Sequence, residues 1–203
     1  MKLRLIFTLI CLLLLVNQVS AENRVTNGDF ETGDLTGWTA DGTNGVTGIE
    51  VGTDYAHNGT YGCKIPASGD RTWRSIKQDV DLTDVDKLEF WYWSDGTSSN
   101  APFMLLIDGS EKWSTYGDHD WTYVEIDVSS YSGEHTIEFQ SVSGLNQGEG
   151  IGVYLDDVVA ETVEYYDITF NFKDYNTQQL LNDVYMNYSV LHSNNDTKIY
   201  YQQ

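Results

Sequence analysis

Short runs in which apolar and polar residues alternate cover most of the chain, and turn-forming residues separate them. The clearest are RSIKQDVDL (74–82), KLEFWYWS (87–94), TYVEIDVS (122–129) and HTIEFQSV (135–142). A period of two is typical of half-buried strands, and the 3.6-residue period of amphipathic helices is almost absent. Strands at this spacing, without intervening helices, indicate two packed sheets. The sequence therefore predicts an all-β fold, a two-sheet β-sandwich.

The first residues have the pattern of a secretory signal peptide. Lys2 and Arg4 precede an apolar run at residues 5–16, and the small residues VSA at 19–21 offer a cleavage site. The apolar run is too short to span a bilayer. No second apolar segment follows, so we expect no membrane insertion. The sequence predicts a signal peptide at 1–21, cleaved from a product that is secreted or held at the cell surface.

A change in composition after Ala160 marks a domain boundary. The acid-rich stretch ETVEYYD leads into ITFNFKDYNTQQLLNDVYMNYSV, where only a few further strands fit. Such a segment is too small for a separate stable sandwich. We expect residues 22–163 to form the sandwich and residues 164–203 to begin a second β-domain. A strand extension packed on the first domain is the alternative. Further β-domains of a surface protein would then be among its partners.

The charge balance is strongly acidic, with 31 Asp and Glu, 11 Lys and Arg, and a formal net charge of −20. Such a charge opposes binding to nucleic acid, which is excluded as a partner. It suits an exported protein that must stay soluble, and it suits calcium, which prefers oxygen ligands. Cys63 is the only cysteine after residue 21, so an internal disulfide cannot form. We expect Cys63 to be buried and inert.

The segments combine into a family resemblance. NGDFETGDLTGW (27–38) resembles the opening of carbohydrate-binding modules of the galactose-binding-like jelly-roll superfamily. The likeness continues through YAHNGTYGCKI, SIKQDVDL, KLEFWYWS, DWTYVEIDVSSYSGEHTIEFQ and the closing VYLDDVV, in the order and spacing of that family. It covers roughly residues 25–161. The resemblance implies a jelly-roll sandwich in which Phe30 and Trp38 belong to the core.

The same resemblance implies a structural calcium ion where the first and last strands meet. Its ligands would be Glu31, just after Phe30, and an acid of the last strand, either Asp156 or Asp157. The loop HNGTYG would add oxygens near Asn58 or Thr60. Calcium takes six to eight oxygen ligands, so this mixture of carboxylates and carbonyls suits it. Acids from both ends of the domain would also make ion binding contribute to folding.

Aromatic residues provide the candidate sugar contacts. Alternation in EFWYW places Phe90 and Tyr92 on one face of the strand and Trp91 and Trp93 on the other, so one pair must face away from the interior. Trp73 lies beside a loop. We expect polysaccharide or glycan contacts from tryptophans, with polar partners beside them; the candidates are Trp73, Trp91, Trp93, Arg71 and Gln78.

Catalytic motifs are absent from the sequence. The four histidines form no metal-binding pair, and neither G-x-S-x-G nor H-E-x-x-H occurs. We therefore expect no enzymatic activity. The sequence predicts an exported, calcium-stabilised carbohydrate-binding module that attaches its owner to glycans. The alternative is a structural or adhesive cell-surface β-sandwich without sugar binding, because this scaffold hosts many roles.

Overall fold

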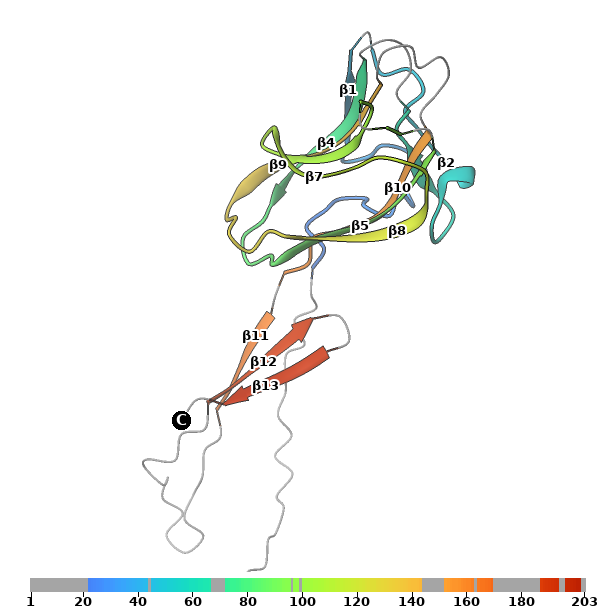
Figure 1. Ribbon diagram of the computed structural model, residues 1–203. Coiled ribbons are helices and arrows are strands. Elements are labelled where there is room, and N and C mark those ends of the chain that lie inside the picture. The colour runs from blue at the N-terminus through green and yellow to red at the C-terminus, as the bar shows by residue number, and fades with distance from the viewer. Residues whose placement is uncertain are drawn as a thin grey trace, which may run out of the picture.

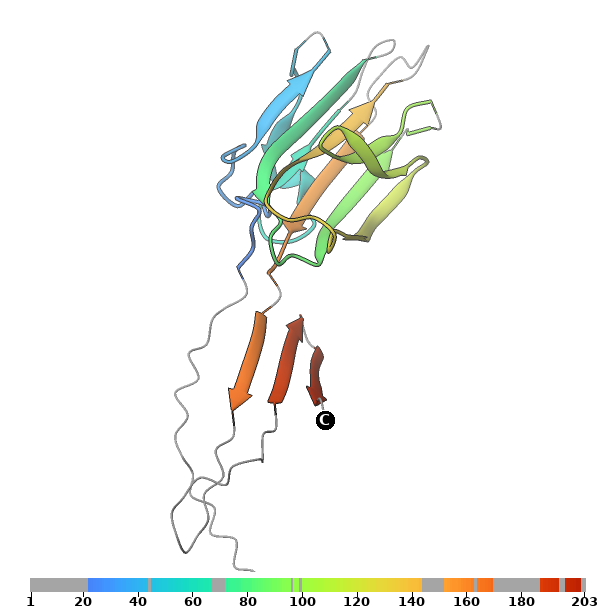
Figure 2. The same cartoon turned by 90° about the vertical axis from the view of Figure 1, so that its left-hand side faces the viewer.

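The computed structural model describes most of the chain beyond the first residues. The described parts are residues 22–43, 45–66, 72–95, 97–98, 100–143, 152–162 and the backbone of three later strands, 164–169, 187–193 and 196–201. The predicted signal peptide and Arg71 lie outside these residues. Two five-stranded sheets face each other, as predicted (Figure 1, Figure 2). No helix in the described residues is long and apolar enough to cross a membrane.

Each sheet is antiparallel throughout, because every recorded strand pair runs in opposite directions. The first sheet has the order β1-β4-β9-β6-β7, with bounds Thr39–Gly42, Trp73–Asp81, Glu134–Val142, Phe103–Ile107 and Ser110–Thr115. The second has the order β2-β3-β10-β5-β8, with bounds Glu50–Gly52, Gly62–Lys64, Gly152–Val159, Lys87–Asp95 and His119–Asp127. A short 3-10 turn, η1, spans Thr53–Tyr55.

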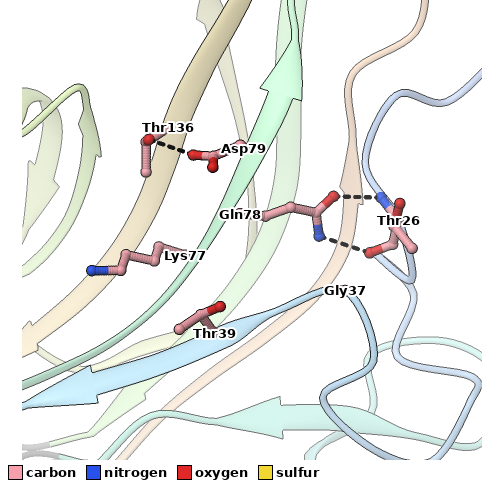
Figure 3. Close-up of a pocket in the computed structure, with 7 residues that line it drawn as sticks. All are labelled: Thr26, Gly37, Thr39, Lys77, Gln78, Asp79 and Thr136. Carbon is pink, nitrogen blue, oxygen red and sulfur yellow. Dashed lines mark hydrogen bonds between the residues drawn. The ribbon is translucent and has the colours of Figure 1, made fainter.

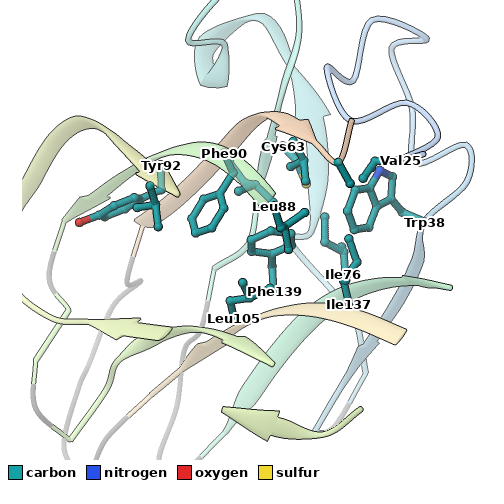
Figure 4. Close-up of a cluster of buried hydrophobic side chains, with 14 of the residues drawn as sticks. Val25, Trp38, Cys63, Ile76, Leu88, Phe90, Tyr92, Leu105, Ile137 and Phe139 are labelled. Carbon is teal, nitrogen blue, oxygen red and sulfur yellow. The ribbon is translucent and has the colours of Figure 1, made fainter. Parts of the chain in front are cut away.

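The core fills the space between the two sheets (Figure 4). Phe90 of β5 meets Phe139 of β9 edge to face, with ring centroids 4.9 Å apart. Phe90 and Tyr92 point inward and Trp91 and Trp93 point outward, which settles the alternation in EFWYW. Edge-to-face contacts between buried rings add to the stability that burial of their area already gives.

Three residues meet the expectations for the interior. Phe30 is fully buried and stacks on Trp38 at 5.8 Å. Cys63 is buried and free, and burial raises the pKa of its thiol well above the usual range. A thiol held in its protonated form is a poor nucleophile, so Cys63 contributes packing.

The C-terminal part contains a separate three-stranded sheet. Its strands are β11 (Glu164–Thr169), β12 (Asn187–Ser193) and β13 (Asp196–Tyr201), in that order. Both pairs in it are antiparallel. The described strands of this part hydrogen-bond with one another and form no ladder with the sandwich.

Candidate functional site

The outer face of the first sheet carries Trp73 at the start of β4. Trp73 is paired in register with Val142 of β9, and both side chains are half-buried. Every second residue of β4 shares this face, so Lys77 and Asp79 lie further along the same surface. Among the described residues, no aromatic ring stacks on Trp73. The flat faces of its indole are therefore free of the ring contacts that occupy the other candidate tryptophans.

A polar hollow of about 510 Å³ opens on the same face (Figure 3). Thr26, Gly37, Thr39, Lys77, Gln78, Asp79 and Thr136 line it. The hollow forms because the pairing of β1 with β4 ends at the Thr39–Lys77 pair, which leaves the edge of β4 beyond Lys77 uncovered by β1. The N-terminal segment around Thr26 closes the far side. The hollow thus offers hydroxyl, amide and charged groups at one end of the surface that begins with Trp73.

Gln78 builds one wall of the polar hollow. Its side chain is buried, its Oε1 accepts the Thr26 N–H at 2.7 Å, and its Nε2 donates to the Thr26 carbonyl at 3.0 Å. Both ends of the amide are thereby used. Gln78 was predicted as a polar sugar partner, and the structure places it as the link between β4 and the N-terminal segment.

Charged side chains surround Lys77 at the hollow. Its Nζ lies 2.9 Å from Asp41 Oδ2. The hydrogen bond to Asp41 raises the pKa of Lys77, and the nearby charges of Glu138 and Asp79 raise it further. Thr136 Oγ1 donates to Asp79 Oδ1 at 2.5 Å. The ammonium group is therefore already matched by carboxylates.

The outer face of the second sheet carries the other two candidate tryptophans. Trp91 stacks on His57 with ring centroids 3.9 Å apart and an angle of 13° between the rings. Trp93 stacks on Tyr154 at 4.6 Å and 15°. Tyr123, 44 % exposed, lies beside Trp91 at 5.6 Å. These rings cover one another, and each of the two tryptophans has one face occupied by a neighbour.

The predicted calcium ligands converge on one loop, residues 57–61. Glu31 Oε1 accepts the N–H groups of Thr60 at 2.6 Å and Tyr61 at 2.8 Å. Asp156 Oδ2 accepts the N–H groups of His57 at 2.8 Å and Asn58 at 3.2 Å. The two acids, far apart in sequence, thus hold the 57–61 loop from its two ends.

The protein surroundings of these acids differ. The N–H groups of Tyr61 and Thr60 lower the pKa of Glu31. Asp156 is fully buried, and burial raises its pKa to about 6, against the lowering effect of its backbone N–H partners. The neighbouring charge of Asp157 raises it further. A buried carboxylate in this position is one that a cation would stabilise in its charged form.

Asp157 points elsewhere. Its Oδ2 lies 2.8 Å from His57 Nδ1, and its backbone φ is +51° beside a bulge in the β10–β5 ladder. The positive φ is uncommon for a non-glycine residue, although aspartate tolerates it better than most. Of the two alternatives for the last-strand ligand, Asp156 is the one that shares the 57–61 loop with Glu31.

No three Asp, Glu, His or Cys side chains in the described part of the chain are grouped as a metal site. A cation between Glu31 and Asp156 would therefore need carbonyl, amide or hydroxyl oxygens of the 57–61 loop as well. Asn58 and Thr60 are exposed members of that loop. The set of oxygen donors is of the kind that calcium takes, so these residues fit the ion that the resemblance implies.

The N-terminal segment is fastened to β10 by contacts that the sequence did not reveal. Asn23 Nδ2 donates to the Val158 carbonyl, and its Oδ1 accepts the N–H groups of Val25 and Ala160. Val158 N–H donates to the Gly28 carbonyl at 2.9 Å.

Lys77 and Asp79 of the polar hollow were also not predicted as site residues, because acidic and basic residues on an outer strand face look like ordinary solvated positions.

Comparisons with known proteins agree with this architecture. Residues 22–94 match a family model described as a carbohydrate binding domain. A solved structure of TmCBM61 in complex with beta-1,4-galactotriose shares the fold with a TM-score of 0.54 and 19% identity, over 68% of this chain and 97% of that one. The resemblance to carbohydrate-binding modules is confirmed.

Two further proteins are similar to this chain, one in structure and one in sequence. A carbohydrate-binding module of the beta-sandwich superfamily, described as having promiscuous specificity, matches with a TM-score of 0.50 and 21% identity, over 69% of this chain and 63% of that one. A multifunctional-autoprocessing repeats-in-toxin protein of Vibrio vulnificus is 32% identical over 152 residues, or 72% of this chain. The chain spans only 3% of the length of that toxin.

Proposed function

We propose that the sandwich is an exported, non-catalytic carbohydrate-binding module that attaches its owner to glycans through the outer face of the first sheet. The observation that carries this proposal is the placement of Trp73 and the polar hollow on one surface. The match to a carbohydrate binding domain supports the general function. The signal-peptide pattern of residues 1–21 supports export.

The chemistry of this surface suits a sugar chain. A pyranose ring presents a flat array of C–H groups that packs on an indole, and its hydroxyls need donors and acceptors around it. Lys77 lies four positions after Trp73, a rise of about 13 Å at roughly 3.3 Å per strand residue. A glycan lying along β4 would therefore contact the indole at one end and reach the hydroxyl and carboxylate groups of the hollow at the other.

Trp91 and Trp93 are a second candidate surface for the same ligand. Their stacking on His57 and Tyr154 leaves ring edges and single faces for a ligand. Flat stacking of a pyranose is less available there than on Trp73, so we place the main contact on the first sheet. Arg71 precedes Trp73 by two residues, and it remains the proposed polar partner at that end.

A structural calcium ion is the second part of the proposal. Glu31 and Asp156 would supply carboxylate oxygens, and Asn58 and Thr60 further oxygens from the 57–61 loop. The ion would neutralise the buried Asp156 and bridge the N-terminal segment to the last strand. Its role would be to stabilise the fold, because the bound state exists only when both ends of the domain are in place.

Retention on immobilised polymers tests the proposed function. The purified protein is run through native gels that contain a neutral polysaccharide, with β-1,4-galactan and mixed-linkage β-glucan as the first two, and is applied to a glycan array. We expect retardation by at least one polymer. Migration unchanged in every gel, with no signal on the array, would contradict the proposal and favour a structural or adhesive surface module.

A further inference from the structure

The outer face of the first sheet is acidic around the polar hollow. Asp41 of β1, Asp79 of β4 and Glu138 of β9 all lie on this face, as their register with Ser75, Thr136 and Lys77 shows. Glu111 of β7 shares it, through its pairing with Leu106. Among the residues that the strand pairing places on this face, Lys77 is the only basic side chain, and its Nζ lies 2.9 Å from Asp41 Oδ2.

Lys77 is therefore a poor anchor for an anion. Its charge is matched by Asp41, and the charges of Glu138 and Asp79 also act on it. A carboxylate brought to the hollow would meet these acids together with the ammonium group. Exposed charges act over about one Debye length, roughly 10 Å at 0.1 M salt. Asp79 in the lining of the hollow and Asp41 and Glu138 beside it therefore act together on a charged group brought there.

The acids can still serve an uncharged sugar. Carboxylate oxygens accept hydrogen bonds from hydroxyl groups, and such charge-assisted bonds are stronger than neutral ones. Asp79 is exposed, and its Oδ1 already accepts a hydrogen bond from the Thr136 hydroxyl, so the carboxylate is open to solvent and acts as an acceptor for a hydroxyl group. Gln140, paired in register with Ser75 and Met104, adds an amide on the same face.

We propose that this face selects uncharged glycans and discriminates against glycans that carry uronate or sulfate groups. The proposal rests on the proposed function and names the ligand class of the same surface. Its basis is the placement of Asp41, Asp79 and Glu138 around Lys77 beside the polar hollow. Discrimination here comes from repulsion of the wrong ligand as well as attraction of the right one.

A matched pair of polymers tests this selection. Neutral β-1,4-galactan and mixed-linkage β-glucan are compared with the same polymers after their C6 hydroxymethyl groups have been oxidised to carboxylates. We expect binding of the oxidised form to be about tenfold weaker at low salt, since several charges of the face contribute. The difference should shrink as salt approaches about 1 M, where the Debye length falls to roughly 3 Å.

Charge variants assign the effect to this face. Asp41→Asn frees Lys77 from its ion pair, and Glu138→Gln removes a second acid. Each variant should therefore bring the affinities for the neutral and the oxidised polymer closer together. Glu125→Gln is the control, because Glu125 pairs with Lys87 on the other sheet at 2.7 Å. Glu125→Gln makes the same change in net charge, and it should leave the ratio of the two affinities, for neutral and for oxidised polymer, as in the parent.

The outcomes separate the two proposals. Equal or tighter binding of the oxidised polymers would overturn the selection and leave the proposed function standing. A ratio that responds to Glu125→Gln as strongly as to Asp41→Asn and Glu138→Gln would overturn its assignment to this face. Binding to no polymer, neutral or oxidised, would overturn both proposals.

Discussion

At the scale of single residues, Gly28 sets how closely the N-terminal segment approaches the last strand of the sandwich. A Cβ atom at this position would lie 2.0 Å from the Val158 carbonyl oxygen and 3.1 Å from a Val25 methyl group. No side chain can occupy that space without a shift of backbone. The glycine is therefore needed for close approach, beside a segment in which Asn27 and Phe30 already adopt positive φ.

Gly28→Ala should destabilise the sandwich. We expect the free energy of unfolding to fall by about 2–3 kcal/mol, because overpacked positions force the backbone to move. Chemical denaturation of the purified protein measures it. Gly152→Ala is the matched control, since among the described residues the only atom near its Cβ would be one of the Trp93 ring, at 3.4 Å. A loss in Gly28→Ala no larger than in Gly152→Ala would contradict the close approach.

Asp108, in the turn after β6, makes a pH-dependent contribution to the stability of the fold. His135 Nδ1 lies 2.7 Å from its Oδ2, and Thr136 N–H donates to its Oδ1 at 3.0 Å. The hydrogen bond with His135, followed by that of the Thr136 N–H, lowers the pKa of Asp108 from its usual range. The stabilisation is present above the unfolded pKa and is lost as pH falls through the lower folded pKa.

Asp108→Asn should therefore lower stability at pH 6 by at most about 1 kcal/mol, since the carboxyl is about half exposed and screened by solvent. The gap between parent and variant should close as pH falls below the ordinary carboxyl range. Asparagine tolerates the positive φ at this position, so backbone strain does not obscure the comparison. Asp54→Asn, in η1, controls for net charge. A gap that stays constant from pH 6 to pH 2 would refute this assignment.

At the scale of elements, the 57–61 loop connects two features of the molecule. Glu31 and Asp156 hold its ends, and His57 at its start stacks on Trp91 of β5. The loop is thus braced by side chains from the N-terminal segment, β10 and β5. A calcium ion between the two acids would add metal–oxygen contacts to a loop whose shape hydrogen bonds already hold.

Calcium should raise the melting temperature. At a concentration about 100 times the dissociation constant, a ligand that binds only the folded state adds about 2.7 kcal/mol, or roughly 5–10 °C for a domain of this size. Thermal melting with calcium and with chelator measures this difference. Glu31→Gln should remove most of the response, and Glu50→Gln, in β2, should keep it. Identical melting curves with calcium and chelator would remove the metal from the account.

The sequence predicted some of these elements better than others. The alternation in EFWYW required one pair of rings to face outward, but it could not show that His57 and Tyr154 cover one face of each tryptophan. The pairing of Glu31 with Asp156 followed from the family resemblance, because no local pattern links residues so far apart. The polar hollow was unpredictable, since it depends on where β1 leaves β4 and on where Thr26 lies.

At the scale of the whole molecule, the two outer sheet faces have different characters. Within the described part of the chain, the first presents Trp73 with no aromatic ring stacked on it, a polar hollow and several acids. The second presents mutually stacked rings around Trp91 and Trp93. Function on this scaffold depends on the site rather than on the fold. The structure therefore offers two surfaces on which a glycan could bind, and the proposed function places the glycan on the first.

The most direct measurement is the affinity of single-tryptophan variants for whichever neutral polysaccharide retards the parent protein. Trp73→Ala should weaken binding by about tenfold or more, because truncation of an aromatic anchor removes most of its contact energy. Trp93→Ala, of the same size change on the other sheet, should bind within about twofold of the parent. Equal thermal stability of the two variants would show that both are folded. Loss of binding in Trp93→Ala with retention in Trp73→Ala would contradict the account and place the glycan on the second sheet.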